Sequence, residues 1–408
     1  MELNQKLSIA IMYESADTDE MGIRLTAEEM GINLVYIPFR KVSVSISNDG
    51  YHFKTKGRHL EKNLEGVNAV LNRMQSKNAR LYAASIMEGL GKYVVNPLTL
   101  EYLCFSKFRS LVELWRRGIR IPSTVFVPLD AHDITTSGRQ LNNEEDIADL
   151  IQEGIGTEDI VLKPDAGTHG REVRLSRDRR TLIKNINSST PSIINPIGFV
   201  AQEFIEKWFY DLRIIVTKER GKPPYCYPTA LARGGFKDFR TNTFLGNMVF
   251  GVKLPMNIRN SSIECGKAMG RDSEAWVLGL DAMFNLGEDR FVDDEYVKSE
   301  LEKLIPSFNG VKTVKREKIK LGKFSNWNKK LENAFHNYMS TTHYNHIKDI
   351  IEESIARNAD NILFHEANSC PEFWEQTRIV GGINVAVPLI KCAQSVAGWS
   401  VFQRYKRY

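Results

Sequence analysis

Apolar runs of strand length alternate with amphipathic segments along the first hundred residues. The apolar runs occupy residues 6–13, 32–39, 66–74 and 92–96. Between them, residues 19–31 and 79–91 place apolar side chains three and four positions apart, which is the spacing of one helix face. Strands that alternate with helices in this way indicate a parallel sheet. The pattern predicts a small parallel α/β domain over residues 1–100.

Beyond residue 97 the regular alternation ends. Residues 99–118 predict a helix that Gly118 ends, and an acidic helix falls within residues 135–157. Two β-rich runs then flank a glycine-bearing turn in residues 158–176. The remaining predicted elements are strands at residues 199–206 and 211–218 and a helix that runs into a short strand at residues 261–284. This part of the chain is therefore also a mixture of helices and strands.

Residues 285–358 are charged and mostly helical, and we interpret them as an insertion. Within them, residues 312–330 carry eight lysines or arginines against one glutamate. Such a charge run is typical of a solvated surface, although a patch that binds an anionic partner is also consistent with it. The sequence leaves the role of the insertion open.

Length, composition and charge narrow the class of protein. The 408 residues are 42% hydrophobic and 26% charged, and the net charge of +5 suits an anionic substrate without favouring a nucleic-acid binder. Five scattered cysteines without a CxxC pair are typical of reduced thiols. The N-terminal apolar run is too short for a signal peptide, and no segment approaches the roughly 20 apolar residues of a membrane span. We therefore expect a cytoplasmic protein without membrane contact.

The most informative segment is LFHEANSCPEF, residues 363–373. An apolar run leads into it, and Glu366 and Asn368 point to the same side because strand side chains repeat every two residues. A carboxylate and a neutral amide oxygen on one face suit a hard cation such as Mg²⁺. Taken alone, the segment also fits a half-buried strand end.

A glycine-bearing turn provides a second candidate site. In VLKPDAGTHGREV, residues 161–173, Lys163 precedes Gly167 and Gly170. Glycines let backbone N–H groups approach an anion closely, and a lysine supplies a compact charge for phosphate. The turn joins strand to strand, so it is neither a Walker A loop nor a dinucleotide fingerprint. Taken alone, it also fits a hairpin turn.

Six short motifs follow one another in an order that resembles the ATP-grasp superfamily, and most closely its RimK-type amino-acid ligases. They are SKFRSLVELWRRGIRIPST, VLKPDAGTHGREV, FVAQEFIEKWFYDLRIIV, DFRTN, GLD and EAN-x-xP. The resemblance covers about residues 1–284 and 360–393. It implies an α/β protein in which a pre-ATP-grasp α/β domain precedes the two α+β subdomains of an ATP-grasp fold. The implied boundaries are residues 1–100 for the first domain, 101–200 for the central subdomain with the glycine loop, and 201–400 for the C-terminal subdomain, which contains the insertion at about 285–358.

The resemblance also implies a role for each matched position, with ATP and Mg²⁺ or Mn²⁺ as cofactors. Lys163 and Arg240 would be the catalytic residues. The nucleotide site would comprise Lys107 and Lys163 on the phosphates, Gly167, Thr168, His169 and Gly170 in the loop that closes over them, Glu203, Phe204 and Ile205 in the adenine hinge, Asp211 on the ribose side, and Arg240, Thr241 and Asn242 near the transferred phosphate. The metal ligands would be Asp281, Glu366 and Asn368.

The implied reaction joins a carboxylate to an amine. The carboxylate attacks the γ-phosphate, the amine attacks the acyl-phosphate, and positioning and charge neutralisation supply the catalysis. We expect an ADP-forming carbon–nitrogen ligase that adds glutamate or another amino acid to an unidentified small-molecule or protein acceptor. A small-molecule kinase of the ATP-grasp type and a non-catalytic nucleotide-binding protein stay open as alternatives, and so does a homo-oligomer.

Two features depart from the family's pattern. Relatives have a short connection between the metal-binding aspartate and the Glu-x-Asn pair, whereas 85 positions separate Asp281 from Glu366 here. The inserted block must therefore leave the sheet and return to it if both residues share a site. Residues 369–372 also replace the family's usual small residue, proline and glycine, which would reshape the acceptor pocket.

Two further signals lie outside these motifs. His336, His343 and His346 have the spacing of one helical face, but the sequence identifies no carboxylate or cysteine partner, so a surface helix is favoured over a zinc site. Arg73 ends a predicted strand, where it fits either a structural ion pair or a contact with substrate.

Overall fold

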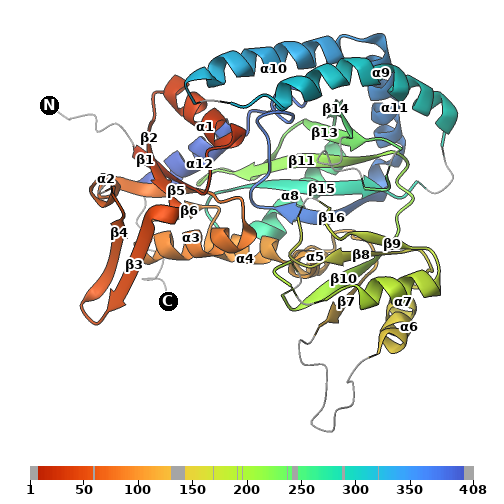
Figure 1. Cartoon of the computed structure of the whole chain (residues 1–408), viewed down its shortest axis with the longest axis horizontal. Coiled ribbons are helices and arrows are strands. Elements are labelled where there is room, and N and C mark those ends of the chain that lie inside the picture. Colours follow the sequence, from red (N-terminus) through yellow and green to blue (C-terminus); the bar gives the residue numbers. More distant parts are fainter. Residues whose placement is uncertain are drawn as a thin grey trace, which may run out of the picture.

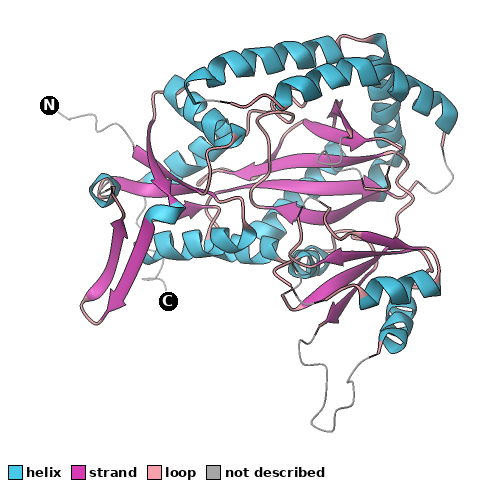
Figure 2. Cartoon of the chain, viewed as in Figure 1, coloured by secondary structure: helices cyan, strands magenta, loops and turns pink. Residues whose placement is uncertain are grey.

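Three main β-sheets follow one another along the chain (Figures 1 and 2). The computed structural model describes residues 8–57, 60–129, 143–168, 170–190, 192–194, 196–236, 238–240, 247–286, 290–319 and 321–398. None of the helices within these ranges is both long enough and apolar enough to cross a membrane.

The first sheet is parallel, with the strand order β2-β1-β5-β6. Its strands are β1 (Ser8–Tyr13), β2 (Asn33–Pro38), β5 (Val67–Arg73) and β6 (Tyr93–Val95). The helices of this region are α1 (Thr18–Glu29), α2 (Glu61–Leu64) and α3 (Lys77–Gly89), with a 3₁₀ turn at Phe39–Lys41. The predicted parallel α/β arrangement is confirmed.

A β-hairpin at the edge of this region was not predicted. It consists of β3 (Val42–Ser47) and β4 (Gly50–Thr55), paired antiparallel. The signal is present in the sequence, because residues 42–47 alternate apolar and polar side chains and Asp49-Gly50 is a common hairpin turn. Gly50 has a φ angle of 141°, which a residue with a Cβ atom adopts only with strain.

The predicted helix at residues 99–118 is wrong in one respect, because the structure divides it at Ser106. The two pieces are α4 (Leu98–Phe105) and α5 (Lys107–Arg116). The Ser106 hydroxyl accepts a hydrogen bond from the backbone N–H of Arg109 at 3.1 Å and donates one to the Asp165 carboxylate at 2.9 Å. Ser106 thus caps a new helix, and its contact with Asp165 fixes where that helix begins.

The second sheet is antiparallel, with the order β7-β10-β8-β9. Its strands are β7 (Thr124–Pro128), β8 (Ile160–Pro164), β9 (Arg174–Ser176) and β10 (Gly198–Glu203). Helices α6 (Glu144–Ile155) and α7 (Arg179–Asn187) pack together beside it around a separate apolar core.

The third sheet is the largest and is also antiparallel, with the order β14-β13-β11-β15-β16 and β12 beside β11. Its strands are β11 (Tyr210–Lys218), β12 (Tyr225–Cys226), β13 (Thr229–Gly234), β14 (Met248–Lys253), β15 (Trp276–Phe284) and β16 (Ile362–Asn368). Helix α8 (Met256–Gly270) packs against β11 and β15. The C-terminal helix α12 (Ala386–Ala397) returns to the first sheet and packs against β5.

The inserted segment enters and leaves this third sheet between two paired strands, β15 and β16. It contains α9 (Asp294–Lys315), α10 (Phe324–Met339) and α11 (Thr342–Asn358), with 3₁₀ turns at Leu321–Lys323 and Ala359–Asn361. Figure 1 places α9 and α10 side by side along the upper edge of the molecule. Their buried side chains, such as Leu304 and Phe335, belong to the same apolar cluster as the third sheet. The helical content predicted for the insertion is thus present, and it is packed into the main core.

Candidate functional site

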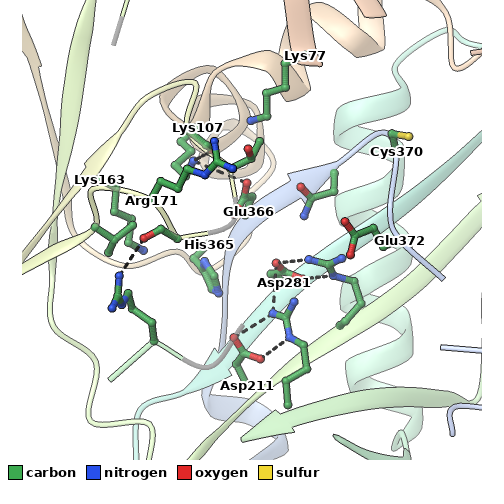
Figure 3. Close-up of a pocket in the computed structure, with 18 of the residues that line it drawn as sticks. Lys77, Lys107, Lys163, Arg171, Asp211, Asp281, His365, Glu366, Cys370 and Glu372 are labelled. Atoms are coloured by element: carbon green, nitrogen blue, oxygen red, sulfur yellow. Dashed lines mark hydrogen bonds and ion pairs between the residues drawn. The ribbon is translucent and has the colours of Figure 1, made fainter. Parts of the chain in front are cut away.

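A cavity of about 610 Å³ is lined by residues from all three sheet regions (Figure 3). Three of the predicted site residues, His169, Thr241 and Asn242, lie outside the described residues. The others all line this cavity: Lys107, Lys163, Gly167, Thr168, Gly170, Glu203, Phe204, Ile205, Asp211, Arg240, Asp281, Glu366 and Asn368. Residues that are up to 261 positions apart in the sequence therefore share one chamber.

Lys107 and Lys163 approach the cavity from different elements. Lys107 is the first residue of α5, so the cap at Ser106 positions it beside the glycine turn, where its Nζ lies 2.6 Å from the Gly167 carbonyl oxygen. The same Nζ lies 3.8 Å from Oε1 of Glu366. Lys163 comes from β8 and donates a hydrogen bond to Gln202 at 2.6 Å. Burial, together with the nearby charge of Lys107, lowers the pKa of Lys163 to about 8.

Two further lysines with lowered pKa values, Lys77 and Lys207, line the cavity and were not predicted from the sequence. Lys77 begins helix α3 and donates a hydrogen bond to the Phe105 carbonyl at 3.2 Å. Burial and the charge of Lys107 lower the pKa of Lys77 to about 8, and burial lowers the pKa of Lys207 to about 8 as well. Buried ammonium groups that repel one another favour an anion between them. The cluster therefore suits a polyanion such as a nucleotide polyphosphate.

The segment after β10 forms an apolar wall of the cavity. Its backbone is fixed by hydrogen bonds from Glu203 N–H to the Ser123 carbonyl at 3.0 Å and from Phe204 N–H to the Asp159 carbonyl at 2.9 Å. The next residue, Ile205, is 4% exposed and packs with Met283 and Leu363 in a small apolar cluster of its own. A rigid strand end beside an apolar surface suits a flat ring such as a nucleobase.

Glu366 and Asp281 are directly opposite one another on β16 and β15, despite the long insertion between them. The register shifts beside Asp281, so His365 has no partner of its own in the ladder and also lines the cavity. Such a bulge re-aims side chains at functional sites. Burial alone would raise the pKa of Glu366, but Lys107 and Lys77 hold it below its usual value.

Glu366 and Asn368 present the oxygen donors that a magnesium ion prefers. Among the described residues, the buried Nδ2 atom of Asn368 has no hydrogen-bond partner, so this N–H donor could complete its bonding with an acceptor such as a phosphate oxygen, while the amide oxygen would face the cation. The donor set at the end of β16 therefore fits a hard divalent cation.

Asp281 is engaged differently. Its two oxygens accept hydrogen bonds from Arg213 at 2.5 and 2.8 Å, and Arg233 lies 3.3 Å from one of them. Burial alone would raise the pKa of Asp281, but Arg213 and Arg233 lower it below the usual range. The carboxylate is thus ionised and faces the cavity, but a metal ion would have to compete with Arg213 for it.

Asp211 belongs to the same network of charges (Figure 3). Both of its oxygens accept hydrogen bonds from Arg233, at 2.8 and 3.0 Å. Arg233 is the register partner of Asp211 on β13, and Arg213 lies two positions along β11, on the same face as Asp211. Neither arginine was predicted to have a role, although the two-residue spacing of Asp211 and Arg213 is visible in the sequence.

Arg240 and Arg73 lie at different parts of the cavity wall. Arg240 donates a hydrogen bond to the Gly170 carbonyl at 3.1 Å and pairs with Asp238 at 2.6 Å, so it lies beside the glycine turn. Arg73 is buried and pairs with Asp19 at 2.9 Å and Glu20 at 3.5 Å. The structural ion pair of Arg73 is therefore observed, and because Arg73 also lines the cavity, its contact with substrate stays a prediction.

Comparisons with known proteins agree with this geometry. The family model for the RimK-like ATP-grasp domain matches residues 106–301. Alpha-aminoadipate–LysW ligase LysX of Sulfolobus acidocaldarius is 26% identical over 271 residues, which cover 65% of this chain and 85% of that protein. A probable alpha-L-glutamate ligase of Maridesulfovibrio salexigens is 28% identical over 211 residues, which cover 51% of this chain and 62% of that protein.

Solved structures extend the similarity to nearly the whole chain. The ATP-grasp ligase PsnB, complexed with a variant of its minimal precursor, Mg and ADP, has a TM-score of 0.52 at 12% identity and covers 96% of this chain and 99% of its own. The D-cycloserine synthetase DcsG has the same TM-score at 11% identity and covers the same shares. At these identities the likeness concerns the fold. The predicted fold class and the resemblance are confirmed, and residues 106–301 match a RimK-like ATP-grasp domain.

Proposed function

We propose that this chain is an ATP-dependent ligase that joins a carboxylate to an amine through an acyl-phosphate and releases ADP and phosphate. The observation that carries the proposal is the meeting of Lys107, Lys163 and Glu366 in one cavity, although they come from α5, β8 and β16. Charged clamps and hard oxygen ligands are what phosphoryl transfer requires, because that reaction depends on positioning and charge neutralisation.

In this proposal each group of side chains has a separate task. Lys107, Lys163 and Lys77 bind the phosphates of ATP, while the wall around Ile205 holds the adenine. Asp281, Glu366 and Asn368 would hold magnesium, which when bound supplies a Lewis acid that neutralises charge on the transferred phosphate. Arg240, beside the glycine turn, stabilises the oxyanion formed when the amine attacks.

The substrates are proposed by analogy with the relatives. Two relatives bear names that specify ligation of an acidic amino acid, α-aminoadipate or glutamate. We propose glutamate or a similar amino acid as one substrate and a small molecule or protein as the acceptor. The lining of the cavity offers cationic, neutral polar and acidic side chains to them, including Arg80, Gln75 and Glu372. We also propose a cytoplasmic location, because all five cysteines are unpaired thiols, as expected in a reducing compartment.

The experiment is a measurement of ADP and phosphate release from Mg²⁺-ATP with a panel of amino acids and a small-metabolite extract, followed by mass spectrometry. A product with the mass of acceptor plus amino acid minus water would support the ligase and identify both substrates. A product that gained one phosphate would replace the ligase with a kinase. ATP binding without turnover in every mixture, including a protein extract, would favour a non-catalytic role.

A further inference from the structure

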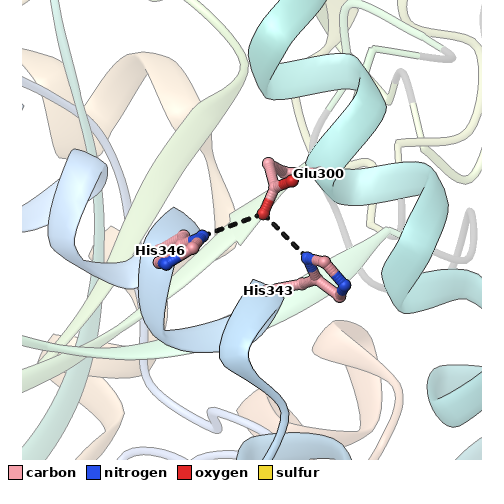
Figure 4. A group of neighbouring side chains, drawn as sticks. All are labelled: Glu300, His343 and His346. Carbon is pink, nitrogen blue, oxygen red and sulfur yellow. Dashed lines mark hydrogen bonds and ion pairs between the residues drawn. The ribbon is translucent and has the colours of Figure 1, made fainter.

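A group of metal-binding side chains lies outside the cavity, on the inserted helices. Glu300 comes from α9, and His343 and His346 come from the first turns of α11 (Figure 4). We propose that these three residues bind one zinc ion. The proposal is independent of the ligase activity, since none of the three lines the catalytic cavity.

The three side chains already point at a common centre. Oε2 of Glu300 lies 2.8 Å from Nδ1 of His343 and 3.1 Å from Nδ1 of His346, and the three potential ligand atoms all lie within 4.8 Å of one another. Ligand atoms about 2.0–2.2 Å from a tetrahedral zinc ion are about 3.3–3.6 Å apart. The two distances from Glu300 are a few tenths of an ångström shorter than this spacing, so small outward movements of the side chains would admit the ion.

The surroundings of Glu300 support it as a ligand. Its side chain is 4% exposed, and its other oxygen, Oε1, accepts a hydrogen bond from Lys303 at 2.8 Å. The hydrogen bond fixes the carboxylate so that Oε2 faces the two imidazoles, which is the task of an outer-shell partner in metal sites. A buried carboxylate held in this way has little rotational freedom to lose when it binds a metal.

The histidines leave room for an ion to enter. The side chains of His343 and His346 are 37% and 49% exposed. Three protein ligands with an open fourth position accommodate a water molecule on zinc, and two imidazoles with one carboxylate suit zinc better than magnesium or calcium. Without a metal, the same contacts would make only an ion-paired clamp between α9 and α11, and the experiment must distinguish the two.

The structure also explains why the sequence argued against this site. The histidine triplet is divided, because α10 ends at Met339 and the Thr341 hydroxyl caps α11, so His336 lies on another helix. The missing carboxylate is supplied from 43 residues upstream by Glu300. The prediction that His336, His343 and His346 share one helical face is therefore wrong. The three side chains that come together are Glu300, His343 and His346.

The test is zinc titration of the full-length, metal-free protein against a chromophoric chelator, with magnesium in excess to fill hard-cation sites. The double variant His343→Ala/His346→Ala should bind one zinc equivalent fewer than the wild type, or bind it at least about a hundredfold more weakly, because outer-shell changes alone cost about 10–100-fold. His336→Ala, an exposed histidine on the neighbouring helix, is the matched control and should behave as the wild type.

A second measurement keeps the proposal testable if the double variant folds poorly. X-ray absorption at the zinc edge of the loaded wild-type protein should show two imidazole nitrogens and oxygen ligands at about 2.0–2.2 Å. Equal zinc stoichiometry and affinity in a folded double variant, or a spectrum without imidazole, would overturn the site and leave the clamp as the explanation.

Discussion

The affinity for ATP should fall as the pH rises above 8, because the lysines that we propose to bind its phosphates lose their protons there. Burial holds the pKa values of Lys163 and Lys77 near 8, about 2.5 units below the usual value for lysine. The phosphates of ATP stabilise the ammonium form and therefore raise both pKa values in the complex. Between the free and bound pKa values, binding takes up protons, so a higher pH opposes it.

The size of the effect follows from the fraction of each lysine that is protonated. With a pKa near 8, that fraction falls from about 0.9 at pH 7 to about 0.1 at pH 9. Each lysine that must be charged therefore weakens binding about tenfold over this range, and Lys163 and Lys77 together weaken it by up to about a hundredfold. The phosphates themselves contribute little, because they are already ionised above pH 7.

The assay is calorimetric titration with ATP at several pH values from 7 to 9.5. Lys163→Arg is the informative variant, because arginine stays charged throughout this range and should remove about tenfold of the pH dependence. A wild-type affinity that is unchanged between pH 7 and pH 9 would refute the reasoning. It would mean either that these amines do not contact the phosphates or that their pKa values are not lowered.

Two substitutions test other parts of the structure. Glu366→Gln keeps the size of the side chain but removes the charge that faces Lys107. ATP turnover should fall at least about a hundredfold, as expected when a charge-stabilising group is lost, while the circular dichroism spectrum stays unchanged. Near-normal turnover would exclude this carboxylate from the metal site. Phe335→Ala removes a fully buried ring of the inserted helix α10. The free energy of unfolding, measured by urea titration, should therefore fall by about 3–5 kcal/mol. A loss below about 1 kcal/mol would contradict the packing of the insertion into the main core.

Local patterns predicted much of the fold, and the family resemblance supplied the candidate residues of the cavity. The strands β1, β2 and β5 lie within a residue or two of their predicted positions, because period and apolar runs are properties of short segments. The spacing of Glu366 and Asn368 was likewise readable from one strand. The roles of the site residues stay predictions, although every one that the structure describes lines the cavity.

What the sequence did not predict depends on partners that are distant along the chain. The break at Ser106 needs Asp165, which is 59 residues away, and the zinc-ligand set needs Glu300 opposite α11. In the sequence, Lys77 resembles a surface lysine, because it follows a serine cap at the start of a helix. Its place in the cavity wall depends on the packing of α3 beside α4. Periodicity describes which face of an element is apolar, but not which other element covers it.

The direct pairing of β15 with β16 has a consequence for how the protein folds. Closing a loop costs about 0.6 kcal/mol more for each doubling of its length, so joining these strands through roughly 80 residues costs about 2.4 kcal/mol more than through five. The inserted segment offsets this cost only when its helices are packed, because the two ends of the segment are then held one strand spacing apart, where β15 and β16 can pair. The alignment of Asp281 with Glu366 is therefore conditional on a helical unit of whose described residues only Lys315 lines the cavity. Inherited or engineered changes deep within α9, α10 or α11 would lower the occupancy of the active conformation without altering a single residue of the cavity.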